Sequence, residues 1–419
     1  MLEQRLGGPG DFDPLVERIG RSRVVMLGEA SHGTYDYYRL REQLTRRLIA
    51  ECGFSFVAVE GDWPDCQRVH RSVVAAPGAD PDPRGALSRF DRWPTWMWAN
   101  AEVARFSRWL RAWNLERPEP DRVGFHGLDV YSLWESMEAI VDHLRRDDPA
   151  ELPAAEAAYS CFEPYGKKIE EYASASRFVS ARCEEEVVQL LVRLRARAER
   201  DGSDSFDAWQ NGEVVAQAER YYHAMVGGGP QSWNVRDNHM ADTLDRLLDR
   251  YGPDARGVVW AHNTHVGDAR ATSMATEGMV NVGQLLRQRY GAAATLLIGM
   301  AGYRGEVLAG AQWGTPERVM RTPPAREGSH EALLHRALGA PAVIDFGTDR
   351  ARPWLTERLG HRAIGVVYDP DREGGNYVPT VMGDRYDALI WLEETSALQT
   401  LHPERVPDVP EYETEPTGL

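Results

Sequence analysis

Residues 24–33, with the sequence VVMLGEASHG, constrain the fold more than any other stretch of the chain. A short apolar run that ends at a glycine and a cluster of polar residues is typical of a buried strand that leads into a loop. In α/β sheets, ligands bind in the crevice beyond the carboxyl ends of the strands. Glu29 and His32 in this loop are therefore candidates for catalysis. The alternative is that they only cap the helix that follows the loop.

The first 130 residues alternate between apolar runs and amphipathic segments. Residues 35–52 carry leucines on one face, as expected of a helix, and residues 54–60, FSFVAVE, form the second predicted strand. A third, short strand is expected at residues 122–125. This order predicts an α/β fold with a mostly parallel sheet and helices on both faces. Further strands are expected at residues 257–261, 295–300, 342–346, 363–367 and 387–392.

The middle of the chain, residues 131–251, has helical spacing and shows no strand pattern. We therefore expect a discontinuous α/β catalytic core of residues 1–130 and 252–400, with residues 131–251 inserted as a helical wall or cap of the active-site cleft. The acidic, proline-containing residues 401–419 are expected to form a loose C-terminal tail. At 419 residues, the chain is long enough to bury a large core.

The charge balance and the cysteines limit the class of protein. The chain has 48 basic and 64 acidic residues, a formal net charge of -16, which argues against binding of nucleic acid. We find no secretory signal and no apolar span of about 18 residues, so we expect no membrane partner. Cys52, Cys66, Cys161 and Cys183 show neither CxxC nor metal-finger spacing, and we expect free thiols in a reducing cytoplasm. The residues carry no signal for an oligomeric state.

Acids and histidines follow four of the predicted strands. Because the carboxyl ends of parallel strands lie side by side, at roughly 5 Å per strand, we expect these side chains to gather in one crevice. One such coincidence has little weight, but four successive strand ends with the same chemistry indicate a site. The four pairs are Glu29 and His32, Glu60 and Asp62, His126 and Asp129, and His262 and His265.

This set of residues favours hydrolysis by general-base catalysis. A neutral imidazole, with an ordinary pKa of about 6.5, takes a proton from water, and a carboxylate on its other nitrogen fixes the tautomer. A second histidine or an arginine then stabilises the oxyanion. Two alternatives are zinc or manganese binding, although HExxH is absent, and Ser31 as a nucleophile, although GxSxG is absent. Walker A and GxGxxG patterns are also missing, and we expect no cofactor and no metal.

The same residues lie in segments that resemble the erythromycin esterase family. The segments are LGEASHGTYDYYRLREQLTRRLIAECGF, VAVEGDWPD, HGLDVYS, RDNHMADTL and VVWAHNTHVGDARA. They follow the family's order over residues 24 to about 285, and the C-terminal third matches more loosely, through YDPDREGGNY and DALIWLEETSAL. The resemblance implies an α/β core with added helices. It also implies hydrolysis of macrolide lactones by a histidine-activated water, without a metal.

The resemblance also implies roles for single residues. His32 matches the family's general base, and Arg236, in the RDNHM segment, matches an arginine near the oxyanion. The other matching active-site positions are Glu29, Glu60, His262 and His265. For binding of a small-molecule ester or lactone, we expect contributions from Trp63, Asp62, His126, Asp129, Trp96 and Arg41.

Three rival functions are compatible with these residues. A metallohydrolase would use the same histidines, and distant relatives that share the GxxH loop include metal-dependent peptidases. A biosynthetic enzyme of the same scaffold would act on a polyketide or sugar intermediate. A non-catalytic protein would bind a ligand without turnover.

Overall fold

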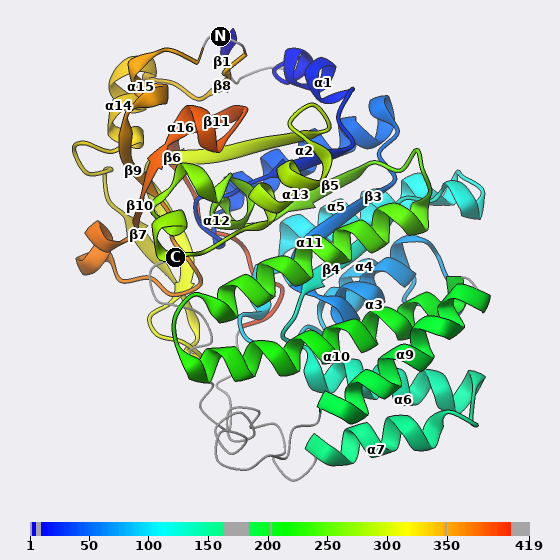
Figure 1. The fold of residues 1–419 in the computed structure, drawn as a ribbon. Helices are drawn as coiled ribbons and strands as arrows, with labels where there is room; N and C mark the ends of the chain where they lie inside the picture. Colours follow the sequence, from blue (N-terminus) through cyan, green and yellow to red (C-terminus); the bar gives the residue numbers. More distant parts are fainter. Residues whose placement is uncertain (1, 6–9, 163–183, 202, 348–349, 404–419) are drawn as a thin grey trace. The chain divides into compact units, whose positions relative to one another are not determined.

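The computed structural model describes residues 2–5, 10–162, 184–201, 203–347 and 350–403 (Figure 1). Among these residues, nine strands form one sheet in the order β1-β8-β11-β6-β2-β5-β3-β4, with β7 paired to β6. In chain order they are β1 (Leu2–Arg5), β2 (Val24–Leu27), β3 (Phe56–Asp62), β4 (Gly124–Asp129), β5 (Gly257–Trp260), β6 (Thr295–Gly310), β7 (Glu317–Thr322), β8 (Ala342–Asp345) and β11 (Ala388–Thr395).

The centre of the sheet is parallel, and the α/β fold with a mostly parallel sheet is confirmed. Strands β11, β6, β2, β5 and β3 pair in parallel, whereas β8 pairs antiparallel with β1 and β11, and β7 antiparallel with β6. Leu27 of β2 lies opposite Trp260 of β5 and Ile298 of β6, and Val59 of β3 also lies opposite Trp260. Because β2 ends at Leu27 and β5 ends at Trp260, the loops after these two strands start at the same edge of the sheet.

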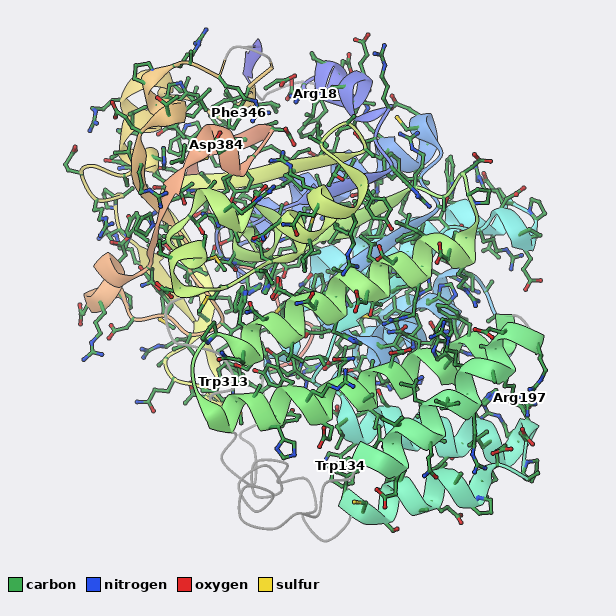
Figure 2. All side chains as sticks on the ribbon, in the orientation of Figure 1. Arg18, Trp134, Arg197, Trp313, Phe346 and Asp384 are labelled. Atoms are coloured by element: carbon green, nitrogen blue, oxygen red, sulfur yellow. The ribbon has the colours of Figure 1, made fainter. Side chains whose placement is uncertain are left out.

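Helices cover these buried strands. The helix α2 (Tyr35–Cys52) ends at Gly53, whose left-handed φ of 67° suits a residue without a side chain. The side chain of Trp260 donates to Thr45 of α2 and contacts Phe106 of α5 (Ala101–Leu115). Both helices therefore lie on the face of the sheet to which Trp260 points. At the other end of the sheet, Arg18 of α1 (Asp13–Ile19), labelled in Figure 2, pairs with Asp345 of β8.

The chain divides into two compact units. The first unit contains residues 1–59, 68–125 and 253–419, and the second contains residues 60–67 and 126–252. The second unit thus includes the predicted helical segment 131–251 together with the last residues of β3 and β4.

The second unit is built on five helices among its described residues. They are α6 (Leu133–Asp147), α7 (Leu152–Phe162), α9 (Glu184–Asp201), α10 (Ser203–Gly227) and α11 (Gln231–Tyr251). Helix α10 packs against α6, α9 and α11, and α7 packs against α6 and α9 (Figure 1). In α6, Leu133, Met137, Ile140 and Leu144 recur at helical spacing and are buried in one apolar core. These residues form the apolar stripe expected of a helix that packs against its neighbours.

Several predicted elements differ from the structure. The strand expected at residues 363–367 is wrong: the strand is β9 (Arg358–Arg362), which pairs with β10 (Tyr377–Val381) in a separate small sheet. The apolar residues 363–367 are instead an irregular segment, in which Ile364 donates from its backbone N–H to the carbonyl of Ala30. This segment is apolar because it is buried next to the loop after β2, and a buried irregular segment has the same apolar sequence pattern as a strand. The strands β1, β7 and β10 were not predicted, and β4 begins two residues later than the expected strand.

The cysteines also differ from expectation. Cys52 and Cys66 carry thiols and form no disulfide, as expected. Cys161, at the end of α7, is disulfide-bonded, so the expectation of a free thiol is wrong there. Spacing along the chain did not reveal this bond, because the geometry of a disulfide is set by the tertiary structure. Cys183 and the predicted tail from residue 404 lie outside the described residues. In the part of the chain that is described, no helix is long and apolar enough to cross a membrane.

Candidate active site

The loop after β2 holds a buried imidazole–carboxylate pair. His32 Nδ1 lies 2.9 Å from Glu29 Oε1, and the other carboxylate oxygen of Glu29 pairs with Arg41 of α2. Arg41 also donates from Nε to the carbonyl of Gly28 at 3.3 Å. A carboxylate only accepts hydrogen bonds, so His32 donates from Nδ1–H and its lone pair is on Nε2. Arg41, predicted to bind substrate, supplies the positive charge that balances the buried Glu29 carboxylate.

Two glycines explain how this loop is held in place. A Cβ atom on Gly33 would lie 1.7 Å from the carbonyl oxygen of Leu308, and one on Gly28 would lie 2.1 Å from Asn263 Oδ1. The carbonyl of Gly33 accepts from the backbone N–H groups of Leu308 at 2.9 Å and of Leu398 at 3.1 Å. Only glycine allows these close approaches, which fix the loop between β6 and the segment after β11.

The segment after β5 brings a second imidazole to this loop. His262 caps the short helix α12 (Asn263–Val266), and its ring centroid lies 4.8 Å from that of His32. Thr264 faces His262 Nδ1 with its hydroxyl at 2.8 Å and with its backbone N–H, which can only donate, at 3.4 Å, so Nδ1 is an acceptor and neutral His262 carries its proton on Nε2. The two imidazoles are therefore complementary: Nε2 of His32 is an acceptor, and Nε2 of His262 is a donor. His265, further along α12, is also buried.

The second unit contains a buried arginine held by two acids. Arg236 of α11 donates from Nε to Asp129 Oδ1 at 2.9 Å and from Nη2 to Asp129 Oδ2 at 2.7 Å. The same Nη2 donates to Glu60 Oε1 at 2.8 Å, and the guanidinium lies 4.9 Å from the ring centroid of Tyr131. The structure thus places together three residues that are distant in sequence, Glu60, Asp129 and Arg236.

The remaining predicted residues of this unit are packed in its interior. The ring of Trp63 stacks on His126 at 5.5 Å, and its Nε1–H donates to Asp207 Oδ1 at 2.7 Å. His126 Nε2 lies 2.9 Å from the hydroxyl of Tyr251. Asp62 is buried as well. Trp63, predicted to line a substrate pocket, is 1% exposed and contacts these neighbours.

In the first unit, Trp96 is likewise an interior residue. It lies in a 3-10 helix (Thr95–Met97) and has no exposed surface. Its carbonyl accepts from the amide of Asn100, which caps α5. A cluster of tryptophans in sequence is as typical of a core as of a binding wall, and for Trp96 the structure shows a core residue.

Sequence reasoning missed several buried polar residues near these groups. Asn263, between His262 and Thr264, contacts His361 of β9, which in turn pairs with Glu331 of α14 (His330–Leu338). His239, one turn after Arg236 in α11, is also fully buried, and burial together with the charge of Arg246 lowers its pKa to about 3. The position of Asn263 between two candidate histidines was the one signal in the sequence; nothing there connects Glu331 with His361.

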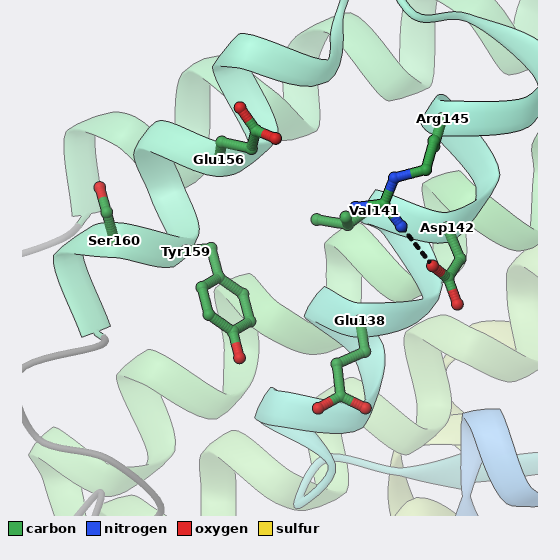
Figure 3. A pocket seen from close by; sticks show the side chains of 7 residues that line it. All are labelled: Glu138, Val141, Asp142, Arg145, Glu156, Tyr159 and Ser160. Atoms are coloured by element: carbon green, nitrogen blue, oxygen red, sulfur yellow. Dashed lines mark hydrogen bonds and ion pairs between the residues drawn. The ribbon is translucent and has the colours of Figure 1, made fainter.

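A hollow of about 580 Å³ lies elsewhere in the second unit, between α6 and α7 (Figure 3). It is lined by Glu138, Val141, Asp142, Arg145, Glu156, Tyr159 and Ser160. None of the predicted site residues lines it. Among the described residues, no group of three or more histidine, cysteine, aspartate or glutamate side chains is arranged to hold a metal ion.

Comparison with known proteins gives one family and one fold. Residues 49–395 match the model of the family described as erythromycin esterase, a range that starts after the loop with Glu29 and His32. The chain is 26% identical to erythromycin esterase type II of Escherichia coli over 325 residues, which cover 71% of this chain and 73% of that protein.

Two solved structures share the fold. One is described as a succinoglycan biosynthesis protein, with a TM-score of 0.79, 19% identity, and coverage of 95% of this chain and 96% of that chain. The other is a mutant of the erythromycin esterase EreC in its open conformation, with a TM-score of 0.70, 17% identity, and coverage of 94% and 98%. At these identities, the likeness shows the fold alone.

Proposed function

Because this chain belongs to the erythromycin esterase family, we propose that it is a hydrolase that cleaves a carboxylic ester or a macrolactone, with His32 as the general base. The observation that carries the proposal is the pair of complementary imidazoles. His32 presents a lone pair on Nε2, and His262 presents an N–H on Nε2, with ring centroids 4.8 Å apart. A base and a hydrogen-bond donor at this spacing suit attack by water on a carbonyl.

In the proposed reaction, His32 acts first as a base and then as an acid. His32 Nε2 takes a proton from water while the hydroxide oxygen bonds to the carbonyl carbon, and Glu29 stabilises the imidazolium through Nδ1–H. The carbonyl oxygen becomes an oxyanion, to which His262 donates. The tetrahedral intermediate then breaks its bond to the alkoxy oxygen, which takes the proton back from His32. The products are a carboxylic acid and an alcohol, which for a lactone are the two ends of one opened molecule.

In the second unit, we propose Arg236 and Glu60 as active-site residues. Their support is the family resemblance and the buried cluster that they form with Asp129. In this cluster, one guanidinium faces two carboxylates. Arg236 therefore has a role that the sequence did not predict, since it neutralises and orients both acids.

The test is a turnover assay on a panel of macrolides and simpler lactones, followed by mass spectrometry for the gain of one water. We expect His32→Asn to lower turnover by about 10²- to 10⁴-fold, the usual span for lost acid–base catalysis. His335→Asn is the matched control, because His335 also hydrogen-bonds a glutamate, Glu393, but is 41% exposed. Near wild-type turnover in His32→Asn would refute the assignment.

The rival functions give different results in the same panel. A metal-dependent hydrolase loses turnover when a chelator is added and regains it with zinc or manganese. A biosynthetic enzyme leaves the macrolides unchanged and acts on a polyketide or sugar intermediate. A binding protein retains a ligand without any change in its mass.

A further inference from the structure

The first unit holds a second buried imidazole–carboxylate pair, apart from the predicted site residues. His361 Nδ1 lies 2.6 Å from Glu331 Oε1, and neither side chain has any exposed surface. The same oxygen of Glu331 accepts from the backbone N–H of Arg362 at 2.8 Å. Because neither side chain is exposed, the pair does not contact substrate directly and acts through the residues that it contacts.

The protonation states of His361 and Glu331 determine which of the two donates the hydrogen bond. Burial raises the pKa of Glu331, but the charges of His361 and Arg362 and the hydrogen bonds that these residues donate outweigh burial and bring it to about 2. Burial lowers the pKa of His361, against the attraction of Glu331. At neutral pH, the pair is therefore a carboxylate and a neutral imidazole. His361 donates from Nδ1–H to Glu331, and its lone pair is on Nε2.

Asn263 uses that lone pair. Its Nδ2 donates to His361 Nε2 at 3.3 Å and to the carbonyl of Met300 at 2.8 Å, and its Oδ1 accepts from the backbone N–H of Met300 at 3.3 Å. These three bonds distinguish the two ends of the amide, because acceptors face its nitrogen and a donor faces its oxygen. Neutral His361 in this tautomer and the backbone of Met300 therefore together fix the orientation of Asn263.

Asn263 in turn contacts both loops that carry the imidazoles. It directly follows His262, and its backbone N–H donates to the carbonyl of Glu29 at 2.9 Å. Its Oδ1 occupies the space in which Gly28 would carry a Cβ atom. A shift of Asn263 would therefore move Glu29 and His262 relative to each other.

We propose that Asn263 is a positioning residue, which His361 and Glu331 orient and which sets the spacing between the His32 and His262 imidazoles. The value of that spacing for catalysis rests on the proposed hydrolysis. The effect of Asn263 on the two imidazoles is measurable without a substrate, through their titration midpoints.

The test compares Asn263→Asp with Asn114→Asp in the full chain. Asn114 is an internal control, because it is buried and makes the same bonds to one backbone residue: Nδ2 donates to the carbonyl of Val123 at 2.9 Å, and Oδ1 accepts from its N–H at 2.8 Å. Either aspartate places an oxygen against a carbonyl, but only the one at 263 also faces His361. Thermal unfolding measures the stability that both variants lose because an aspartate oxygen lies against a carbonyl oxygen.

The main readout is a histidine NMR titration of the ring resonances, assigned with His32→Asn and His262→Asn. We expect Asn263→Asp to move the titration midpoints of His32 and His262, and Asn114→Asp to leave both unchanged. On a substrate found by the panel, Asn263→Asp should lower kcat about 10- to 100-fold, as for a reacting group displaced by about 1 Å, with little change in KM. Asn263→Ala, which adds no charge beside His262, is measured in the same comparison and takes the place of Asn263→Asp if that variant does not fold. A midpoint shift in Asn263→Asp that is absent from Asn263→Ala is the Coulomb effect of the new carboxylate and counts against the proposal.

A conservative exchange at His361 adds an independent readout. His361→Gln keeps a donor for Glu331 and an acceptor for Asn263, whereas His361→Leu keeps neither. We expect the glutamine variant to retain the wild-type midpoints of His32 and His262 and the leucine variant to shift them. Unchanged midpoints in folded Asn263→Asp and His361→Leu would overturn the proposal, even if the panel finds a substrate. An empty panel with shifted midpoints would refute the proposed function and leave the positioning role in place.

Discussion

Two imidazole–carboxylate pairs in the first unit have nearly the same geometry and different surroundings. Nδ1 and Oε1 are 2.9 Å apart in the His32–Glu29 pair and 2.6 Å apart in the His361–Glu331 pair. His32 keeps 6% of its side chain exposed and faces a second imidazole, whereas His361 is sealed and faces an amide. The hydrogen bond between imidazole and carboxylate alone therefore does not define a catalytic pair. Under the proposed function, what the other edge of the imidazole faces, water and substrate or a fixed protein group, decides whether the pair moves a proton or holds a neighbour.

The largest effect in this comparison is expected at Arg41, which balances Glu29. Arg41→Met leaves a buried carboxylate without its cation, and we expect the free energy of unfolding to fall by about 3–5 kcal/mol. Denaturant unfolding at neutral pH measures it. Arg39→Met, on the same helix but only partly buried, is the control and should cost less than about 1 kcal/mol. Equal stabilities of the two variants would show that Glu29 does not depend on Arg41.

A smaller and pH-dependent effect is expected at Glu331. Its pKa is lowered from 4.5 to about 2, so its stabilising contribution is complete above about pH 4.5 and is lost as the pH falls toward 2. Glu331→Gln should therefore reduce the free energy of unfolding at neutral pH by on the order of 3 kcal/mol, from about 1.4 kcal/mol per pKa unit. The difference from wild type should shrink below pH 4.5. Unfolding curves between pH 7 and pH 3 measure this difference; a constant difference would contradict the ionised carboxylate.

The smallest effect is expected at a third pair on the surface. His335 Nδ1 lies 2.6 Å from Glu393 Oε2, with side chains that are 41% and 18% exposed. Because solvent competes for both groups, we expect Glu393→Gln to change the free energy of unfolding by less than about 1 kcal/mol. The same unfolding assay measures it. If Glu393→Gln lowered the free energy of unfolding as much as Glu331→Gln, burial would not explain the difference between the two pairs.

The sequence was sufficient for the parts of the site that follow short apolar strands. Residues 24–27 and 257–260 are strands as expected, and their aligned ends bring His32 and His262 together. Pattern and resemblance were enough there, because the side chains that matter lie within a few residues of the strand that positions them.

The rest depended on contacts between distant parts of the chain. Glu331 and His361 belong to a helix and a strand whose approach to Asn263 has no local signal. Trp63 and Trp96 look alike in sequence whether they line a pocket or fill a core, and their burial follows from the packing of neighbouring elements. For Arg236, the family resemblance suggested a group near an oxyanion, while its distance to Glu60 and Asp129 depends on tertiary structure.

The hydrogen bond from Leu398 to the carbonyl of Gly33 has a consequence for biosynthesis. The ribosome makes the GEASHG loop early and residue 398 more than three hundred codons later. A nascent or proteolysed chain that ends before residue 396 holds every acid and base of the loop after β2 but lacks one of the two backbone donors to Gly33, that of Leu398. Activity should therefore begin only after the last strand has been translated and folded into the sheet.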